Sequence, residues 1–303
     1  MKENNGEIIN NFLRLISQHD PTHIEFAKKS VLVLSEQERS EFEQVIKFYV
    51  SNGKTFDEVY ECYRLIIKDA LKQGIHFAKT GKYKYSNFNE IYHLVYSNAA
   101  YMERYMIGLS ITSFLWLNHV MLARFFASIL PKLNDRNGNY LEVGPGHGIF
   151  FKKVINSGKF SNAVALDVSE TSLELTRDII DIGKKTCEVE FLHADFLTYR
   201  FSNINFNTVV IGEVLEHVEE PSEFIKQATN LLAYNGTLFI STCINAPAID
   251  HLYNWDSIVD LEDDLTRFGL KVEDRLLLPT AGLSVEQCEA QRKTINVGYL
   301  LRK

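Results

Sequence analysis

The sequence predicts an α/β protein in which an all-helical N-terminal part precedes a mostly parallel sheet. Three observations support this fold class. Apolar residues recur at helical spacing before residue 131, strand-like and helix-like segments alternate after residue 139, and a polar link (131–139) separates the two patterns. Alternating strands and helices are typical of parallel sheets. The predicted division is a helical domain over residues 1–133 and a second domain over residues 134–303.

The N-terminal part contains at least five predicted helices. Apolar residues over 8–16 mark the first. Ser35 with Glu38, and Thr55 with Glu58, fit the capping-box pattern and predict where the second and third helices begin. Two further helices, both rich in aromatic residues, are predicted at 86–109 and 111–130.

The C-terminal part contains seven predicted strands, and helical patterns separate the first five. Each strand is a short apolar run bounded by polar residues or glycine. The runs cover residues 140–143, 163–166, 188–192, 208–211, 236–241, 271–278 and 294–301.

Composition limits the kind of partner. The chain has 303 residues, 32 basic and 39 acidic, and no basic stripe, which disfavours a nucleic-acid partner. Its four cysteines are scattered, which favours free thiols in a reducing compartment. The N-terminus lacks a signal-peptide pattern, and the apolar stretch 106–130 contains Asn118, His119 and Arg124. We therefore expect a cytoplasmic chain without a membrane span, whose helical part could form a homodimer.

The glycine-rich stretch at 140–148 is the most informative part of the chain. It reads Tyr-Leu-Glu-Val-Gly-Pro-Gly-His-Gly and predicts a strand, a tight turn and the start of a helix. Glycines allow a positive φ and a close approach of a ligand to the backbone, and the first N–H groups of the helix face that ligand. A dinucleotide loop needs G-x-G-x-x-G, and Ile149 stands where its third glycine would be. A nicotinamide oxidoreductase is therefore disfavoured.

The stretch resembles the S-adenosylmethionine (SAM) loop of class I methyltransferases, E-x-G-x-G-x-G, which Glu142, Gly144, Gly146 and Gly148 complete, with Pro145 between the first two glycines. The resemblance covers residues 139–303. It implies a doubly wound seven-stranded sheet whose last two strands form an antiparallel edge. It also implies SAM as the cofactor and methyl transfer as the activity.

Two further segments resemble cofactor contacts of that family. Asp167 ends the second predicted strand about 20 residues after the loop, followed by Val168, and its carboxylate can accept hydrogen bonds from both ribose hydroxyls. The resemblance implies that Asp195 bonds the adenine amino group and that Phe196 packs on the ring. The alternatives are a helix N-cap for Asp167 and a turn aspartate beside a core phenylalanine for Asp195.

Residues 212–218, Gly-Glu-Val-Leu-Glu-His-Val, resemble the corresponding segment of ubiquinone-pathway O-methyltransferases, which places Gly212 and Glu213 beside the methionine part of SAM. Glu213, Glu216 and His217 also resemble the metal ligands of small-RNA 2′-O-methyltransferases. The same residues also occur in methyltransferases that need no metal. The second histidine of the RNA methyltransferases has no clear counterpart in this sequence. We therefore expect no metal, and an RNA 2′-O-methyltransferase remains an alternative.

The segment 245–253 follows the fifth predicted strand and resembles a loop of methyltransferases that act on small natural products. His251 is the first candidate for a general base, because the pKa of a free histidine lies near neutrality. Asn245 and Tyr253 are candidate substrate contacts. The alternative for His251 is a surface histidine that caps a following helix.

The aromatic helices before the link supply the remaining candidates. Tyr96 and Tyr101 are expected to contact the substrate, and His119 is the second candidate base. A helical cover over the crevice favours a small-molecule acceptor, methylated on oxygen, nitrogen or carbon, with a lean towards aromatic or amino-acid-derived metabolites. A SAM-binding interaction module without catalysis is the other alternative.

Overall fold

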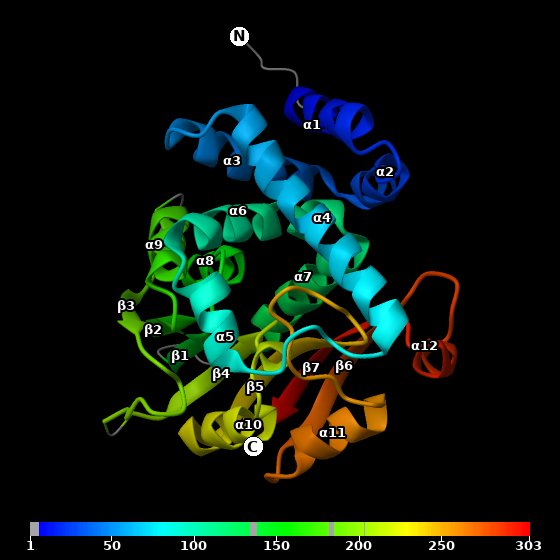
Figure 1. The fold of residues 1–303 in the computed structure, drawn as a ribbon. Coiled ribbons are helices and arrows are strands. Elements are labelled where there is room, and N and C mark those ends of the chain that lie inside the picture. Colours follow the sequence, from blue (N-terminus) through cyan, green and yellow to red (C-terminus); the bar gives the residue numbers. More distant parts are fainter. Residues whose placement is uncertain (1–5, 134–137, 182–184, 203) are drawn as a thin grey trace.

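The computed structural model describes residues 6–133, 138–181, 185–202 and 204–303 (Figure 1). Seven strands form one sheet in the order β3-β2-β1-β4-β5-β7-β6, in which β7 is antiparallel to both β5 and β6 and the other pairs are parallel. The strands are β1 (Gly138–Val143), β2 (Phe160–Asp167), β3 (Glu188–His193), β4 (Phe206–Gly212), β5 (Leu232–Ile244), β6 (Lys271–Pro279) and β7 (Ile295–Arg302). The predicted mostly parallel sheet and its antiparallel edge are confirmed.

Helices cover both faces of the sheet, as a doubly wound fold requires. Neighbouring residues of one strand point to opposite faces, so Tyr140 of β1 belongs to one core cluster and Leu141 to another. The helices that follow the first strand are α8 (Ile149–Ile155), α9 (Glu170–Ile180), α10 (Pro221–Leu231), α11 (Ile258–Thr266) and α12 (Val285–Gln291).

The N-terminal part is helical, as predicted, but its boundaries differ. Its helices are α1 (Glu7–His19), α2 (Ile24–Val33), α3 (Glu36–Ser51), α4 (Phe56–Thr80), α5 (Phe88–Ile91), α6 (Ala99–Leu115) and α7 (Leu117–Ile129). Both predicted capping boxes are present, at the starts of α3 and α4. The prediction missed α2, where Ala27, Ser30 and Val31 are the buried residues and leave only a weak apolar period.

The predicted helix at 86–109 is wrong as a single element. After α5 the chain makes a π-helical turn (Tyr92–Tyr96), and the Asn98 side chain then accepts a hydrogen bond from the Tyr101 N–H to start α6. A side chain that caps a helix in this way favours a new helix over continuation of the previous one. Trp116, with φ −115° and ψ 117°, separates α6 from α7.

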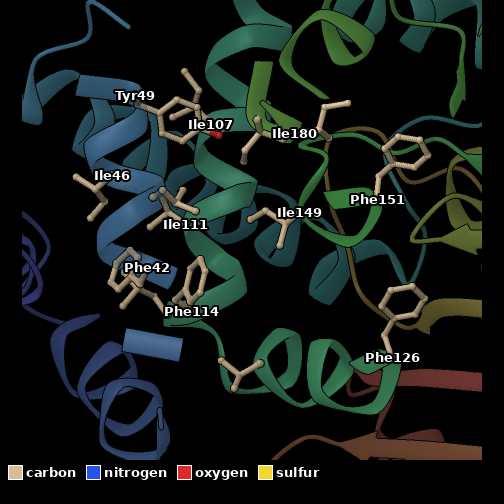
Figure 2. Packing of buried hydrophobic residues seen from close by; sticks show 14 of the residues in the cluster. Phe42, Ile46, Tyr49, Ile107, Ile111, Phe114, Phe126, Ile149, Phe151 and Ile180 are labelled. Atoms are coloured by element: carbon tan, nitrogen blue, oxygen red, sulfur yellow. The ribbon is translucent and has the colours of Figure 1, made fainter. Parts of the chain in front are cut away.

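Helix α6 connects the two predicted domains. It contacts α2, α3, α4, α7 and α9, and buried residues lie around its whole circumference. Figure 2 shows Phe42 of α3 and Ile111 of α6 in the same cluster as Ile149 of α8. The hydrophobic core therefore continues across residue 133. Residues 134–137 of the predicted link lie outside the described residues.

Two further sequence expectations concern membranes and cysteines. No single helix among the described residues is long and apolar enough to span a membrane; α6 and α7, extended to Lys132, meet the length and composition criteria only together, across a bend of 83°. All four cysteines carry free thiols.

The crossing of α4 and α6 leads to a prediction about stability. A Cβ added at Gly108 of α6 would lie 2.3 Å from the carbonyl oxygen of Cys62, whereas a Cβ added at Gly74 of α4 would have no atom within 4 Å. Gly108→Ala is therefore expected to lower the free energy of unfolding by about 1–3 kcal/mol, because the helices must move apart. Gly74→Ala is the matched control and should raise it by about 0.5–1 kcal/mol. Urea unfolding of both variants tests this, and equal effects would show that α4 and α6 do not meet so closely.

Candidate functional site

A cavity of about 520 Å³ lies at the carboxyl ends of the parallel strands, under the N-terminal helices. Its floor is formed by the ends of β1, β2, β4 and β5, and its roof by α4, α6 and the start of α7. Open α/β sheets bind ligands at this edge. Ile66 of α4, Met106 of α6 and Gly144 after β1 line the same space, so the roof and the glycine loop enclose one cavity.

The glycine loop lines one end of the cavity. Gly144, Gly146 and Gly148 have φ values of 67°, 57° and 74°, which L-residues with side chains rarely adopt. Gly144, Pro145 and Gly146 line the cavity. Gly148 does not line it: a Cβ at this position would lie 2.9 Å from Thr176 Cα of α9, so this glycine allows α8 and α9 to pack closely.

Asp167 and Val168 lie beside the glycine loop, at the end of β2. Both line the cavity, and the Asp167 side chain is buried. One carboxylate oxygen accepts a hydrogen bond from the Ser169 N–H at 2.8 Å, while Ser169 itself caps α9. Burial raises the pKa of Asp167 to about 6, so the carboxylate is mostly ionised at neutral pH. This geometry suits a ligand that donates hydrogen bonds, such as a ribose.

Glu142 and Glu213 bring two more carboxyl groups to this end, and burial raises the pKa of each to about 8. Glu142 accepts a hydrogen bond from the Tyr140 hydroxyl. Glu213, beside Gly212, has a φ of 53°, and its Oε1 has no hydrogen-bond partner among the described residues. Ser172 Oγ and Ser241 Oγ are also buried without a partner there, and all three atoms belong to residues that line the cavity. Such groups are rare in proteins, and a polar ligand in the cavity would supply their partners.

The two residues after β3 differ in position. Phe196 is buried and lines the cavity. Asp195 is exposed and is not among the lining residues; its carboxylate accepts a hydrogen bond from the Leu197 N–H at 2.8 Å. The structure therefore places Asp195 in the turn geometry that the sequence allowed as an alternative.

Asp250 organises the other end of the cavity. Its Oδ1 accepts a hydrogen bond from the Tyr105 hydroxyl at 2.9 Å, and its Oδ2 accepts one from the Tyr96 hydroxyl at 3.1 Å. His217 Nδ1 lies 3.3 Å from Oδ2. All four side chains line the cavity. The sequence predicts Tyr96 as a substrate contact, whereas nothing in the sequence distinguishes Tyr105 from the other aromatic residues of the predicted helices.

The two candidate bases, His251 and His119, both line the cavity. Burial lowers the pKa of His251 to about 3 and that of His119 to about 4. Both are therefore neutral at pH 7, but a proton acceptor with so low a pKa is weak. His119 Nδ1 also lies 2.8 Å from the Thr112 hydroxyl. These pKa values speak against either histidine as a strong general base, and the buried position of His251 contradicts a surface capping role.

Three expected substrate contacts do not line the cavity. Tyr101 stacks on Tyr105 with ring centroids 5.7 Å apart, and the Tyr253 ring packs against that of Trp255. Asn245 is held by two hydrogen bonds with the Asn254 side chain. None of Tyr101, Asn245 and Tyr253 is among the lining residues.

Potential metal ligands gather near Asp250. His217, Asp250 and His251 each offer a donor atom within 4.8 Å of the others, and so do Glu216, Cys243 and His251. Glu213, one of the three residues in the metal alternative from the sequence, belongs to neither group among the described residues.

A family model described as "Methyltransferase domain" matches residues 117–274. The match begins in α7 and ends in β6, so it includes the glycine loop and the end of the helical roof.

Curated relatives match over a shorter stretch. The ubiquinone biosynthesis O-methyltransferase of Vibrio campbellii is 30% identical over 126 residues, which are 37% of this chain and 52% of that protein. The mitochondrial enzyme of the same name from Candida albicans is 29% identical over 117 residues, 36% of this chain and 34% of that protein. The chain thus spans between a third and about half of these two relatives.

Solved structures resemble the fold more distantly. The N-methyltransferase NodS of Bradyrhizobium japonicum, in complex with S-adenosyl-L-homocysteine, is 16% identical with a TM-score of 0.48, covering 61% of this chain and 87% of its own. The cyclopropane synthase MmaA2 of Mycobacterium tuberculosis is 12% identical with a TM-score of 0.48, covering 61% and 84%.

Proposed function

Because the chain belongs to the methyltransferase-domain family, whose model matches more than half of its residues, we propose that it transfers the methyl group of SAM to a small-molecule acceptor inside the cavity. One observation carries this proposal: the glycine loop and the helical roof enclose a single cavity with two polar ends. The first end suits the cofactor and the second suits an acceptor.

The cofactor end can hold SAM through contacts of different kinds. Gly144 and Gly146 allow the ligand to approach the backbone, and the Asp167 carboxylate accepts hydrogen bonds from the ribose. Phe196 packs against the adenine. The unpartnered Glu213 Oε1 is a partner for the amino group of the methionine part. These assignments predict that S-adenosylhomocysteine (SAH), the product left after transfer, occupies the same place.

Methyl transfer from SAM requires alignment of donor and acceptor more than chemical activation of the donor. Bound SAM would supply the methyl group: the sulfur–methyl bond would break with its electron pair going to sulfur, and the acceptor atom would form the new bond to the methyl carbon. A hydroxyl acceptor would also lose its proton, for which the neutral His251 imidazole is the acceptor in reach. Because the leaving group is already a sulfonium, the protein mainly has to hold donor and acceptor in line and exclude water. The roof residues Ile66, Met102 and Met106 give the cavity apolar walls that serve this purpose. His251 and the Asp250 group would contact the acceptor.

The charge of the cavity supports a small molecule over RNA. Among the described residues that line it, none is lysine or arginine. An RNA substrate would need such side chains to contact its phosphates. The names of the curated relatives favour methylation on oxygen within the small-molecule class.

The role of Asp167 can be tested by binding. Asp167→Asn replaces an ionised acceptor by a neutral amide, so SAH affinity at pH 7.5 should fall tenfold or more, in line with about 1.5–3 kcal/mol for a hydrogen bond to a charged group. Since the pKa of Asp167 is raised to about 6, wild-type affinity should also fall as the pH drops below 6 and the carboxylate is protonated. Calorimetry of both proteins between about pH 5 and pH 8, a range that includes this pKa, gives the pH dependence of SAH affinity for each.

Asp178→Asn, on the exposed side of α9, is the matched control and should leave SAH affinity unchanged. Identical pH profiles for wild type and Asp167→Asn would remove Asp167 from the cofactor site.

If the acceptor site is enclosed, a substitution that fills it should stop methyl transfer without weakening SAH binding. Ala70 of α4 lines the cavity, while its neighbour Leu71 is 61% exposed. With an acceptor found by screening metabolites for SAH release, Ala70→Trp should abolish turnover because the indole fills the acceptor space, and SAH affinity should remain. Leu71→Trp should keep both.

Full turnover by Ala70→Trp would contradict the enclosed acceptor site. Tight SAH binding without turnover on any acceptor would instead favour a SAM-binding module without catalysis.

A further inference from the structure

Five side chains with metal-binding atoms converge at the acceptor end of the cavity. Glu216 and His217 lie on the 3₁₀ turn after β4, Cys243 lies near the end of β5, and Asp250 and His251 lie on the following loop. The loop is fixed to the turn by the backbone, because the N–H groups of residues 252 and 253 donate to the Glu216 carbonyl at 2.8 and 3.1 Å. The position of these side chains is therefore set by the fold on both sides.

This end of the cavity carries more negative than positive groups. Asp69, Glu216 and Asp250 line it, and no described lining residue is lysine or arginine. The His217 imidazole faces two of them, with Nδ1 3.3 Å from Asp250 Oδ2 and Nε2 3.9 Å from Glu216 Oε1. Buried carboxylates are costly when they are not fully compensated by a partner. A bound cation would offset this cost. Nitrogen and sulfur donors beside the carboxylates favour a transition-metal ion over an alkali-metal ion.

We propose that His217, Asp250 and His251 form a binding site for one divalent transition-metal ion. Two imidazoles and one carboxylate are a ligand set that binds iron, cobalt and zinc, and it leaves coordination positions open. In a tetrahedral site with metal–nitrogen and metal–oxygen bonds of about 2.0–2.1 Å, donor atoms lie about 3.3 Å apart. The donor atoms of His217, Asp250 and His251 lie within 4.8 Å of one another. His217 Nδ1 donates a hydrogen bond to the Asp250 backbone carbonyl at 3.1 Å, so Nε2 is the nitrogen of this imidazole that can bind the ion.

The surroundings of the three ligands orient them for this task. The Tyr105 and Tyr96 hydroxyls each donate to one oxygen of Asp250, which holds the carboxylate plane while leaving a lone pair on each oxygen. The His251 ring lies next to that of His217, with centroids 4.7 Å apart. Its Nδ1 faces the Cys243 thiol at 3.8 Å, a long contact with a weak donor. A neutral, buried imidazole in this position is suited to bind a metal.

The open positions of the ion face the cavity, because all three ligands line it. Given the proposed methyltransferase function, the acceptor is then a compound that offers an oxygen ligand, such as a hydroxyl or an oxo acid. A metal-bound oxygen group loses its proton more readily. Binding of the ion can be measured without any acceptor, so it is tested separately from that function.

The test uses the tag-free full-length chain, stripped of metal with a chelator and titrated with Co²⁺ and with Zn²⁺. We expect one ion per chain by calorimetry. The Co²⁺ absorption spectrum should show nitrogen and oxygen ligands without a thiolate charge-transfer band. Asp250→Asn and His251→Gln should each weaken Co²⁺ binding at least tenfold, because each removes a ligand.

Two variants serve as controls. His119→Gln alters a histidine that lines the same cavity outside the three ligands, and Cys243→Ser alters the adjacent thiol; both should bind Co²⁺ as the wild type does. Absence of stoichiometric Co²⁺ and Zn²⁺ binding by the wild type would overturn the proposal. A thiolate band, or loss of binding in Cys243→Ser with none in Asp250→Asn, would overturn this choice of ligands.

SAH affinity, measured on every sample, shows whether a variant is folded and keeps the two proposals apart. A chain that binds SAH but no metal refutes the metal site alone. A chain that binds metal but no SAH refutes the proposed methyltransferase function alone.

Discussion

The burial of α6 is the constraint on which both the fold and the cavity depend. This helix lies between the N-terminal helices and the helices of the sheet, and at Gly108 it approaches α4 so closely that no side chain fits. Its apolar residues complete the core that includes α8 and α9, while Tyr105 and Met106 face the cavity. Removing α6 would therefore expose the core and open the cavity together. The helical part is thus an integral part of the fold and of the cavity.

The two ends of the cavity are built by different means. The cofactor end is made mostly of backbone and short segments that directly follow strands, such as Gly144 after β1 and Asp167 at the end of β2. The acceptor end is made of side chains that reach across the molecule, with Tyr96 and Tyr105 from the roof meeting Asp250 from a loop after β5. Under the proposed function, variation of the roof and this loop would change the acceptor while the cofactor end stays the same.

Electrostatics distinguishes this cavity from an ordinary apolar pocket. Burial raises the pKa of Glu142, Asp167 and Glu213, and it lowers the pKa of His119 and His251. In each case the low-polarity surroundings disfavour the charged form. A bound cationic ligand would lower the pKa of the carboxyl groups again, because it stabilises their charged form as water does in the unfolded chain. SAM carries such a charge on its sulfonium, and a metal ion would carry one at the other end.

The sequence by itself determined the α/β class, the seven strands, both capping boxes and the glycine loop, because each depends on residues close together in the chain. Only the tertiary structure decided where α6 begins and ends and which tyrosines line the cavity. It alone also brings Asp250, His217 and His251 together. The Tyr105–Asp250 hydrogen bond joins residues 145 positions apart, and such a contact leaves no periodic pattern. The acidities of the buried groups likewise depend on desolvation, which exists only once the chain has folded around them.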